Sequence, residues 1–149
     1  MITLIAAMNK HRTLGLNGTI PWRNREDLQH FKDYTMNKTV VMGRVTYEGL
    51  PKKLEGRNIF VVSRDEKYDI QDLKRYLEGD FDEEIVVAGG GEIYKEAIQF
   101  ADKLVISIIH DNDVIGDTFF PEIDLTVFNK TKSVKFKTFT LEIYKRKDF

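Results

Sequence analysis

The feature that most constrains this chain is the alternation of short β-rich segments with helical patterns. Five segments are dense in Val and Ile and lack a clean polar alternation, which is typical of strands covered on both faces. Between them, apolar residues recur at helical spacing. This alternation predicts an α/β fold with a mainly parallel central sheet and helices on both faces. The expected strands are Ile2–Ala7, Thr39–Met42, Asn58–Ser63, Glu84–Ala88 and Lys103–His110.

The segments between these strands carry the start and stop signals of helices. Glu26 and Asp27 would lie in the first turn of one helix, where the helix dipole favours anions. Asp69 and Gly79 are the expected N-cap and C-cap of another helix. The expected helices are Arg25–Tyr34, a short helix after Gly43 that runs through Val45 and Tyr47, Ile70–Glu78, and Glu92–Ala101.

The end of the chain shows a different pattern. Val134 and Phe136 share one parity, whereas Phe139, Leu141 and Ile143 share the other. This switch predicts a bulge or turn near residues 137–138 and an antiparallel strand pair at the C-terminus. Because 149 residues is an ordinary size for one domain, we expect a single domain over residues 1–149.

Composition argues against several classes of function. The 23 Lys and Arg residues balance 24 Asp and Glu, so no general affinity for nucleic acid or anionic membranes is expected. The absence of Cys excludes disulfides, a thiolate nucleophile and a Cys-based zinc site. His11, His30 and His110 lie far apart, so no metal site is expected. The apolar run Leu4–Met8 is too short to span a membrane and no leader pattern precedes it, so we expect a cytoplasmic protein.

Three of the expected strands end in residues suited to binding phosphate. In an open α/β sheet, ligands bind beyond the carboxyl ends of the strands, and here those ends carry Gly43-Arg44, Ser63-Arg64 and Gly89–Gly91. Glycines let backbone N–H groups approach an anion, and guanidinium groups donate charge-assisted hydrogen bonds. Together these ends suggest a cradle for a dinucleotide, although each alone is also explained by tight packing or surface charge. Tyr94 occupies the third glycine position of the GxGxxG spacing, so the run is not a Rossmann fingerprint.

The glycine-rich segment Gly15–Trp22 and the helix after it form a second candidate feature. The segment contains Asn-Gly, which favours a turn, and a loop at this place can act as a lid. In the helix, Asp27 lies beside Leu28 and four residues before Phe31, at the border of the apolar face. A carboxylate there would be partly desolvated and could bind a cationic or amidine-like group. The position equally suits an acid that complements the helix dipole, and Trp22 equally suits a core anchor.

These residues together resemble dihydrofolate reductase, and the similarity runs from Met1 to about Pro121. No single motif is decisive, but the ordered set is specific. The matching residues are Ile5-Ala6-Ala7, Gly15, Pro21-Trp22, Asp27-Leu28, Phe31, Val41-Met42-Gly43-Arg44, Thr46, Leu54, Gly56-Arg57, Ser63, Ala88-Gly89-Gly90-Gly91, Tyr94, Gly116-Asp117-Thr118 and Phe120-Pro121.

The resemblance implies an NADPH-dependent oxidoreductase that reduces 7,8-dihydrofolate to 5,6,7,8-tetrahydrofolate, with hydride transfer to C6 and protonation at N5. Asp27, Trp22 and Tyr94 are the implied catalytic residues, and Asp27 would bind the pterin and favour protonation at N5. Arg57 would bind the glutamate α-carboxylate with its planar fork, and Ser107 would support Asp27. The implied apolar walls of the substrate pocket are Ile5, Ala7, Leu28, Phe31, Leu50 and Leu54.

The resemblance also implies the cofactor contacts. Arg44 and Arg64 would favour the 2′-phosphate of NADPH, so NADH should be a much poorer cofactor. The loop over residues 9–24 would close over the nicotinamide and be steadied by the segment near residues 116–117, and a cis peptide would join Gly89 to Gly90. The implied cofactor-binding residues are Ala7, Ile20, Gly43, Arg44, Thr46, Ser63, Arg64, Gly89, Gly90, Gly91 and Tyr94.

Two other functions stay open on the residues alone. Another NADPH-dependent reductase on the same scaffold, of the riboflavin-biosynthesis type, would share the sheet and the glycine turn, but Trp22, Asp27 and Arg57 together favour a folate. A non-catalytic nucleotide-binding module is the second alternative. We expect a monomer whose partner is the small-molecule substrate, with no nucleic-acid or membrane partner, because Lys130–Lys137 is typical of a solvated strand face.

Overall fold

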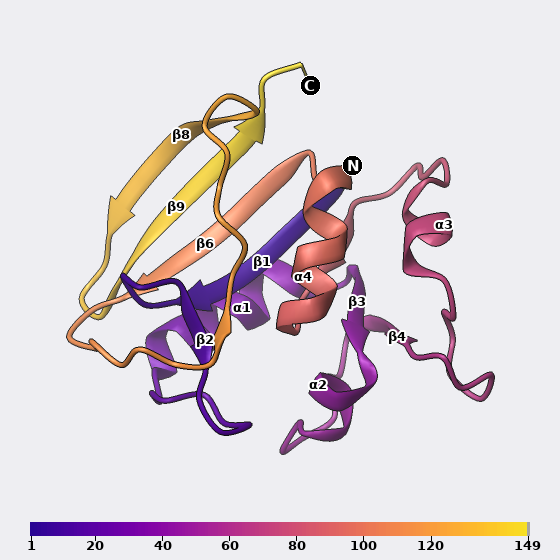
Figure 1. Ribbon diagram of the computed structural model, residues 1–149, viewed down its shortest axis with the longest axis horizontal. Coiled ribbons are helices and arrows are strands. Elements are labelled where there is room, and N and C mark those ends of the chain that lie inside the picture. The colour runs from indigo at the N-terminus through magenta and orange to yellow at the C-terminus, as the bar shows by residue number, and fades with distance from the viewer. Residues whose placement is uncertain (149) are drawn as a thin grey trace.

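The computed structural model describes residues 1–148, and a seven-stranded sheet runs through its centre (Figure 1). The strand order is β4-β3-β5-β1-β6-β9-β8. The first five strands pair in parallel and the last two pair antiparallel, which confirms the predicted mixed sheet with its antiparallel C-terminal pair. The strands are β1 (Ile2–Met8), β3 (Thr39–Gly43), β4 (Asn58–Val62), β5 (Ile85–Val87), β6 (Lys103–Ile109), β8 (Phe128–Lys135) and β9 (Phe139–Arg146).

Helices cover both faces of this sheet, as predicted. Figure 1 shows α4 in front of the sheet and α1 behind it. On the α1 face, Phe31 packs against a buried cluster that includes Ile5 and Val105. On the other face, the buried Tyr94 belongs to a cluster that includes Leu4. The helices are α1 (Arg25–Thr35), α2 (Arg44–Glu48), α3 (Leu73–Leu77) and α4 (Gly91–Ala97), with a 3₁₀ turn η1 (Ile98–Phe100) after α4.

The helix predicted over Ile70–Glu78 is shorter than expected, and its predicted cap is wrong. Asp72, not Asp69, is the N-cap of α3. Ile70 extends the sheet edge instead, and its N–H donates to the Val61 carbonyl at 3.0 Å. The Asp69 carboxylate accepts a hydrogen bond from the Val61 N–H at 2.8 Å. This tertiary pairing uses the residues that would have formed the first helical turn.

A second, two-stranded sheet was not expected from the sequence. It pairs β2 (Thr13–Gly15) with β7 (Thr118–Phe119) in antiparallel fashion. Next to it, the Asp117 N–H donates to the Gly15 carbonyl at 3.0 Å, and the Asn17 N–H donates to the Asp117 carboxylate at 2.9 Å. The loop over residues 9–24 is therefore fastened to the segment around residues 116–117, as the resemblance implied.

The C-terminal strands meet at the predicted turn. The Phe136 N–H donates to the Phe139 carbonyl at 2.8 Å, which closes the hairpin between β8 and β9. Val134 lies opposite Leu141, so the apolar residues on the two sides of the turn share one face. The bulge lies earlier, where the register shifts between Lys130 and Lys132. No helix among residues 1–148 has the length and apolarity needed to cross a membrane.

A polar cluster fastens α1 to the amino ends of the central strands. The Glu84 carboxylate accepts hydrogen bonds of 2.6 Å from both the Thr3 hydroxyl and the Tyr34 hydroxyl, and it forms an ion pair with Lys38 at 3.1 Å. Burial alone would raise the pKa of Glu84, but these three donors lower it. The cluster fixes the last turn of α1, and so it positions the first turn of that helix at the opposite edge of the sheet.

Candidate active site

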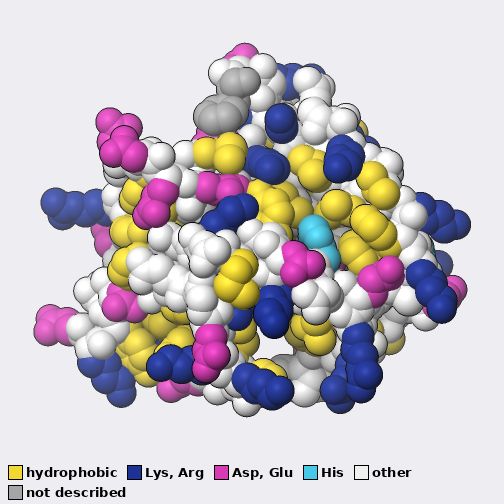
Figure 2. Space-filling model, turned by 180° about the vertical axis from the view of Figure 1, so that it is seen from behind, with side chains coloured by type: hydrophobic (Ala, Val, Ile, Leu, Met, Phe, Trp, Pro, Cys, Tyr) yellow, Lys and Arg dark blue, Asp and Glu magenta, His cyan; other side chains and the backbone are white. Residues whose placement is uncertain are grey.

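Many of the predicted site residues lie near the edge of the sheet where β1, β3 and β5 end, whereas Arg57 directly precedes β4 and contacts Thr35 in the last turn of α1. Helix α2 begins directly after β3, and α4 begins four residues after β5. Figure 2 shows the face that carries α1, and a hollow near its lower edge is bordered by hydrophobic and basic side chains. This edge is the place where an open α/β sheet binds ligands.

Asp27 is the buried carboxylate of this edge. It lies in the first turn of α1, where its N–H donates to the Asn24 side chain at 2.9 Å, and only 8% of its surface is exposed. Burial raises the pKa of Asp27, and hydrogen bonding by Ser107 together with the charge of His30 partly offsets this effect. Ser107 is buried on β6 directly opposite Ala7 of β1. The site therefore holds a carboxyl group that a hydrogen-bonding cationic ligand would stabilise in its charged form.

His30 is a neighbour of Asp27 that the sequence reasoning did not assign to the site. Its spacing of three residues from Asp27 on a helix was the available signal. The His30 ring packs against Phe139 at 5.7 Å between centroids, and its Nε2 is buried without a hydrogen-bond partner among the described residues. Burial lowers the pKa of His30, although the Asp27 charge opposes that shift. His30 is therefore a partly buried aromatic neighbour of the carboxyl group.

The predicted substrate-pocket residues mostly form one apolar surface beside Asp27. The side chain of Leu28 is the exception, since 58% of its surface is exposed. That exposure places Leu28 at the mouth of the site rather than in its wall. The members of the common cluster are Ile5, which is buried, and the partly buried Ala7, Trp22, Phe31, Leu50 and Leu54.

Arg57 lies at the far end of this surface. Its Nη1 donates to the Thr35 hydroxyl at 3.3 Å, and its Nε is buried without a hydrogen-bond partner among the described residues. Arg57 as a whole is only partly buried, and its guanidinium group carries five N–H donors. The arrangement suits a carboxylate ligand that engages both donor positions of the fork.

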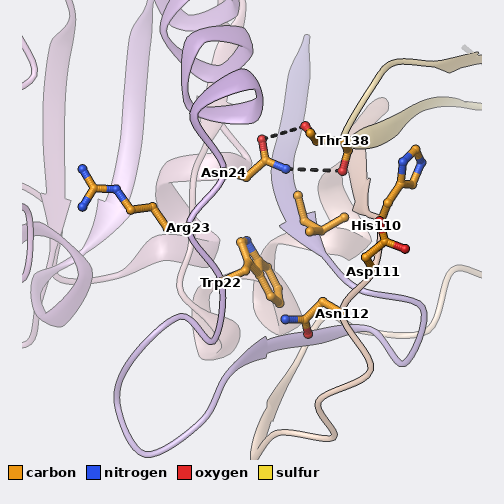
Figure 3. Close-up of a pocket in the computed structure, with 8 residues that line it drawn as sticks. Trp22, Arg23, Asn24, His110, Asp111, Asn112 and Thr138 are labelled. Atoms are coloured by element: carbon orange, nitrogen blue, oxygen red, sulfur yellow. Dashed lines mark hydrogen bonds between the residues drawn. The ribbon is translucent and has the colours of Figure 1, made fainter.

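Trp22 lies between the apolar surface and a second hollow, drawn in Figure 3. In that view its indole ring lies beside Asn112, whose side-chain amide donates to the Pro21 carbonyl at 3.3 Å. Asn24 closes another side by donating to the Thr138 carbonyl at 3.3 Å. Asp27 does not line this hollow. Its lining residues are Trp22, Arg23, Asn24, Ile109, His110, Asp111, Asn112 and Thr138.

Tyr94 approaches the site from the opposite face of the sheet. Its hydroxyl donates to the Ile5 carbonyl at 2.6 Å, and its side chain is almost fully buried. Burial and, to a smaller extent, the Asp27 charge raise the pKa of Tyr94, so the hydroxyl stays protonated. Its position holds β1 and α4 together directly behind the apolar surface.

The glycines predicted to bind a cofactor form a close backbone cradle. The Gly43 N–H donates to the Gly89 carbonyl at 2.9 Å, and the Gly89–Gly90 peptide is cis, as the resemblance implied. A Cβ on Gly90 would lie 3.1 Å from the Thr46 hydroxyl, so a side chain there would fill the space. The N-caps of α2 and α4 are Gly43 and Gly90, which offer no capping side chain, unlike the N-caps of α1 and α3. Open backbone N–H groups in such a cradle fit a phosphorylated dinucleotide.

The predicted phosphate-binding residues lie at adjacent strand ends. Gly43 pairs with Val62, so Arg44 and Ser63 follow their strands side by side. Ser63 and Arg64 line a separate shallow hollow together with residues from the start of α3. Ile20 is 64% exposed on the loop before α1, where it contributes to neither buried cluster.

Comparison with known proteins agrees with this geometry. The profile of the dihydrofolate reductase family matches residues 1–146. Dihydrofolate reductase of Mycoplasma genitalium is 32% identical over 99% of both chains, and that of Neisseria meningitidis is 41% identical over 84% of this chain and 82% of its own. A solved structure of dihydrofolate reductase from Enterococcus faecalis, complexed with NADP(H) and RAB-propyl, superposes with a TM-score of 0.85 at 30% identity and covers 99% of this chain and 97% of its own. The chain belongs to the dihydrofolate reductase family.

Proposed function

We propose that this protein reduces 7,8-dihydrofolate to 5,6,7,8-tetrahydrofolate with NADPH, and that Asp27 is its central catalytic residue. The observation that carries this proposal is the buried Asp27 carboxyl group beside Ser107, at the edge of a continuous apolar surface. A pterin presents a flat apolar ring with an amidine-like edge, which such a surface and carboxylate complement. Membership in the family supports the same reaction.

Bound NADPH supplies the hydride that C6 of the substrate accepts. The chain's own contribution is to hold the two ligands in reacting geometry. Gly43, Gly90 and Thr46 form the backbone cradle for the cofactor, and Arg44, Ser63 and Arg64 supply donors for its 2′-phosphate. The loop over residues 9–24, fastened through Asp117, covers the edge of the site and excludes water.

The substrate binds along the apolar surface in this proposal. The walls formed by Ile5, Ala7, Phe31, Leu50 and Leu54 bury the pterin and aminobenzoyl rings, and Leu28 contacts them at the mouth of the site. Arg57 binds the glutamate carboxylate with the planar fork of its guanidinium group. Trp22 and Tyr94 support the apolar surface from opposite sides. Trp22 packs on this surface, and Tyr94 holds the backbone of Ile5 in place from behind it.

Asp27 then assists the chemical step through its charge. Its carboxylate binds the amino group and ring N–H of the pterin, and this favours protonation at N5, which makes C6 electrophilic. Because its pKa is raised, Asp27 exchanges a proton at a pH closer to the physiological value than an exposed aspartate does. We further propose that the chain acts as one domain, as a monomer and in the cytoplasm, and that metal ions play no part.

The direct test is the loss of NADPH absorbance when dihydrofolate is added to the purified protein. Rapid oxidation that requires both compounds, and that is much slower with NADH, is the expected result. A protein that binds NADPH but leaves dihydrofolate unreduced would contradict the folate assignment. The other reductase chemistry of this scaffold would then be the function to test.

A further inference from the structure

Arg44, the first residue of α2, is already engaged within the chain. Its Nη1 lies 2.6 Å from Oε1 of Glu48, and the Tyr68 hydroxyl donates to the other carboxylate oxygen of Glu48 at 3.2 Å. Glu48 thus joins α2 to the connection that follows β4. The spacing of four residues between Arg44 and Glu48 is readable in the sequence, but the contact with Tyr68 is visible only in the fold.

This ion pair is poorly placed to stabilise the helix that carries it. Arg44 stands at the amino end of α2 and Glu48 at its carboxyl end, so each charge opposes the helix dipole. A basic residue four positions before an acidic one is also the weaker orientation of such a pair. Both side chains are about half exposed, at 45% and 50%, so the pair adds little to stability. Helix stability therefore does not account for the arrangement.

The position of the pair relates it to the cofactor instead. Gly43 and Val62 are paired in the sheet, so Arg44 lies beside Ser63 at neighbouring strand ends. A 2′-phosphate bound by Arg44 and Arg64 would either displace the Glu48 carboxylate from Arg44 or lie close to that carboxylate. Two anions that share one guanidinium compete for its donors and repel each other.

We propose that Glu48 is a specificity-determining residue that weakens the preference of this site for a 2′-phosphorylated cofactor. It does so by holding Arg44 in competition with the phosphate, and Tyr68 keeps the carboxylate oriented for that contact. The inference rests on the proposed function, because it assumes the cofactor edge assigned there. It concerns binding alone, so it can be measured without turnover.

The test is the dissociation constant of Glu48→Gln for two matched ligand pairs, measured by fluorescence or calorimetric titration. The pairs are NADPH against NADH, and adenosine 2′,5′-bisphosphate against AMP. Glutamine keeps the size of Glu48 and one of its two acceptor oxygens but removes its charge. We expect the variant to bind the 2′-phosphorylated member of each pair about two- to tenfold more tightly, with the other member nearly unchanged. The gain should shrink as salt rises from about 0.01 M to about 1 M.

Two further comparisons distinguish the specific contact between Glu48 and Arg44 from a general effect of charge. Glu122→Gln removes the same charge from an exposed position far along the chain, and it should leave all four constants unchanged. In an Arg44→Gln background, Glu48→Gln should lose most of its selective gain, because its partner is gone.

Equal changes in both members of a pair, no change in either, or a full gain in the Arg44→Gln background would each overturn the inference. Failure of the unaltered protein to bind NADPH at all would instead overturn the proposed function. Binding of NADPH without a selective gain therefore separates the two failures.

Discussion

At the scale of a single side chain, Asp27 shows how a proposed catalytic residue can lower stability. Only 8% of its surface is exposed, and among the described residues no side-chain cation pairs with it. Burial raises its pKa, which means that the ionised form is less stable in the folded chain than in water. In the proposed function, a bound pterin would supply the missing donors and remove this penalty.

Replacement of Asp27 by Asn is therefore expected to stabilise the ligand-free protein at neutral pH, by about 1 kcal/mol. Since the folded pKa lies above the unfolded value near 3.8, ionised Asp27 destabilises the fold above the raised pKa. This penalty disappears as the pH falls through that pKa. Urea unfolding at about pH 7 and about pH 4 should show a gain at the higher pH only. A variant less stable at pH 7, with the exposed Asp80→Asn as a control, would contradict the account.

Arg57 gives a second prediction at this scale. Lysine in its place keeps the positive charge but loses the planar fork, so two-point binding of a carboxylate is lost. We expect Arg57→Lys to raise KM for dihydrofolate about tenfold or more, with kcat little changed. A pterin substrate that lacks the glutamate should be reduced equally well by both proteins. An equal loss for both substrates would show that Arg57 acts on the fold rather than on the glutamate.

At the scale of elements, the sequence predicts best those segments whose pattern is local. The strands β1, β3 and β6 are continuous apolar runs because both their faces are covered, and their positions follow within a residue or two. The start of α3 was not predictable, because Ile70 pairs with the edge of β4, a contact that no local pattern encodes. The strands β2 and β7 have three and two residues, too few for a period to show.

The residues of the candidate site also divide into those that a local pattern predicts and those that depend on tertiary contacts. The position of Asp27 at the border of an apolar helix face was readable from spacing, and its role came from the resemblance to a family. The unused Nε of Arg57 and the contact of Tyr68 with Glu48 depend on tertiary packing, so only the fold reveals them. His30 is an intermediate case, since its spacing from Asp27 was visible but its burial against Phe139 was not.

A substitution at Gly116 tests the role of the small sheet formed by β2 and β7. A Cβ at this position would collide with the Gly15 carbonyl oxygen and with the Thr13 side chain. Gly116→Ala should therefore separate β2 from β7, release the loop over residues 9–24 and slow dihydrofolate turnover about tenfold or more. The loss of folding stability should stay within about 1–3 kcal/mol, because the central sheet is untouched.

A matched control lies in the same loop. Gly18 has a positive φ of 78°, but a Cβ at this position would meet no atom within 4 Å, and asparagine tolerates that backbone conformation. Gly18→Asn should leave turnover nearly unchanged. If Gly116→Ala were as active as Gly18→Asn, the contact between the two loops would have no part in catalysis.

At the scale of the whole molecule, the contacts that anchor α1 and the residues of the candidate site lie at opposite edges of the sheet. The Glu84 cluster ties α1 to the amino ends of the strands, whereas Asp27 and the glycine cradle lie at the carboxyl ends. Helices on both faces bury the strands between these edges (Figure 1). The sheet therefore sets the separation between the apolar surface beside Asp27 and the glycine cradle.

In the proposed mechanism, one buried carboxyl group, Asp27, promotes the protonation that reduction requires. Dihydrofolate turnover at saturating NADPH, measured across pH for the unaltered protein and for Asp27→Asn, tests this role. At neutral pH the variant should be slower by about a hundredfold or more, while NADPH binding is unchanged. Its activity should recover toward acidic pH, where the substrate is protonated without assistance. Full activity of Asp27→Asn at neutral pH would contradict the account.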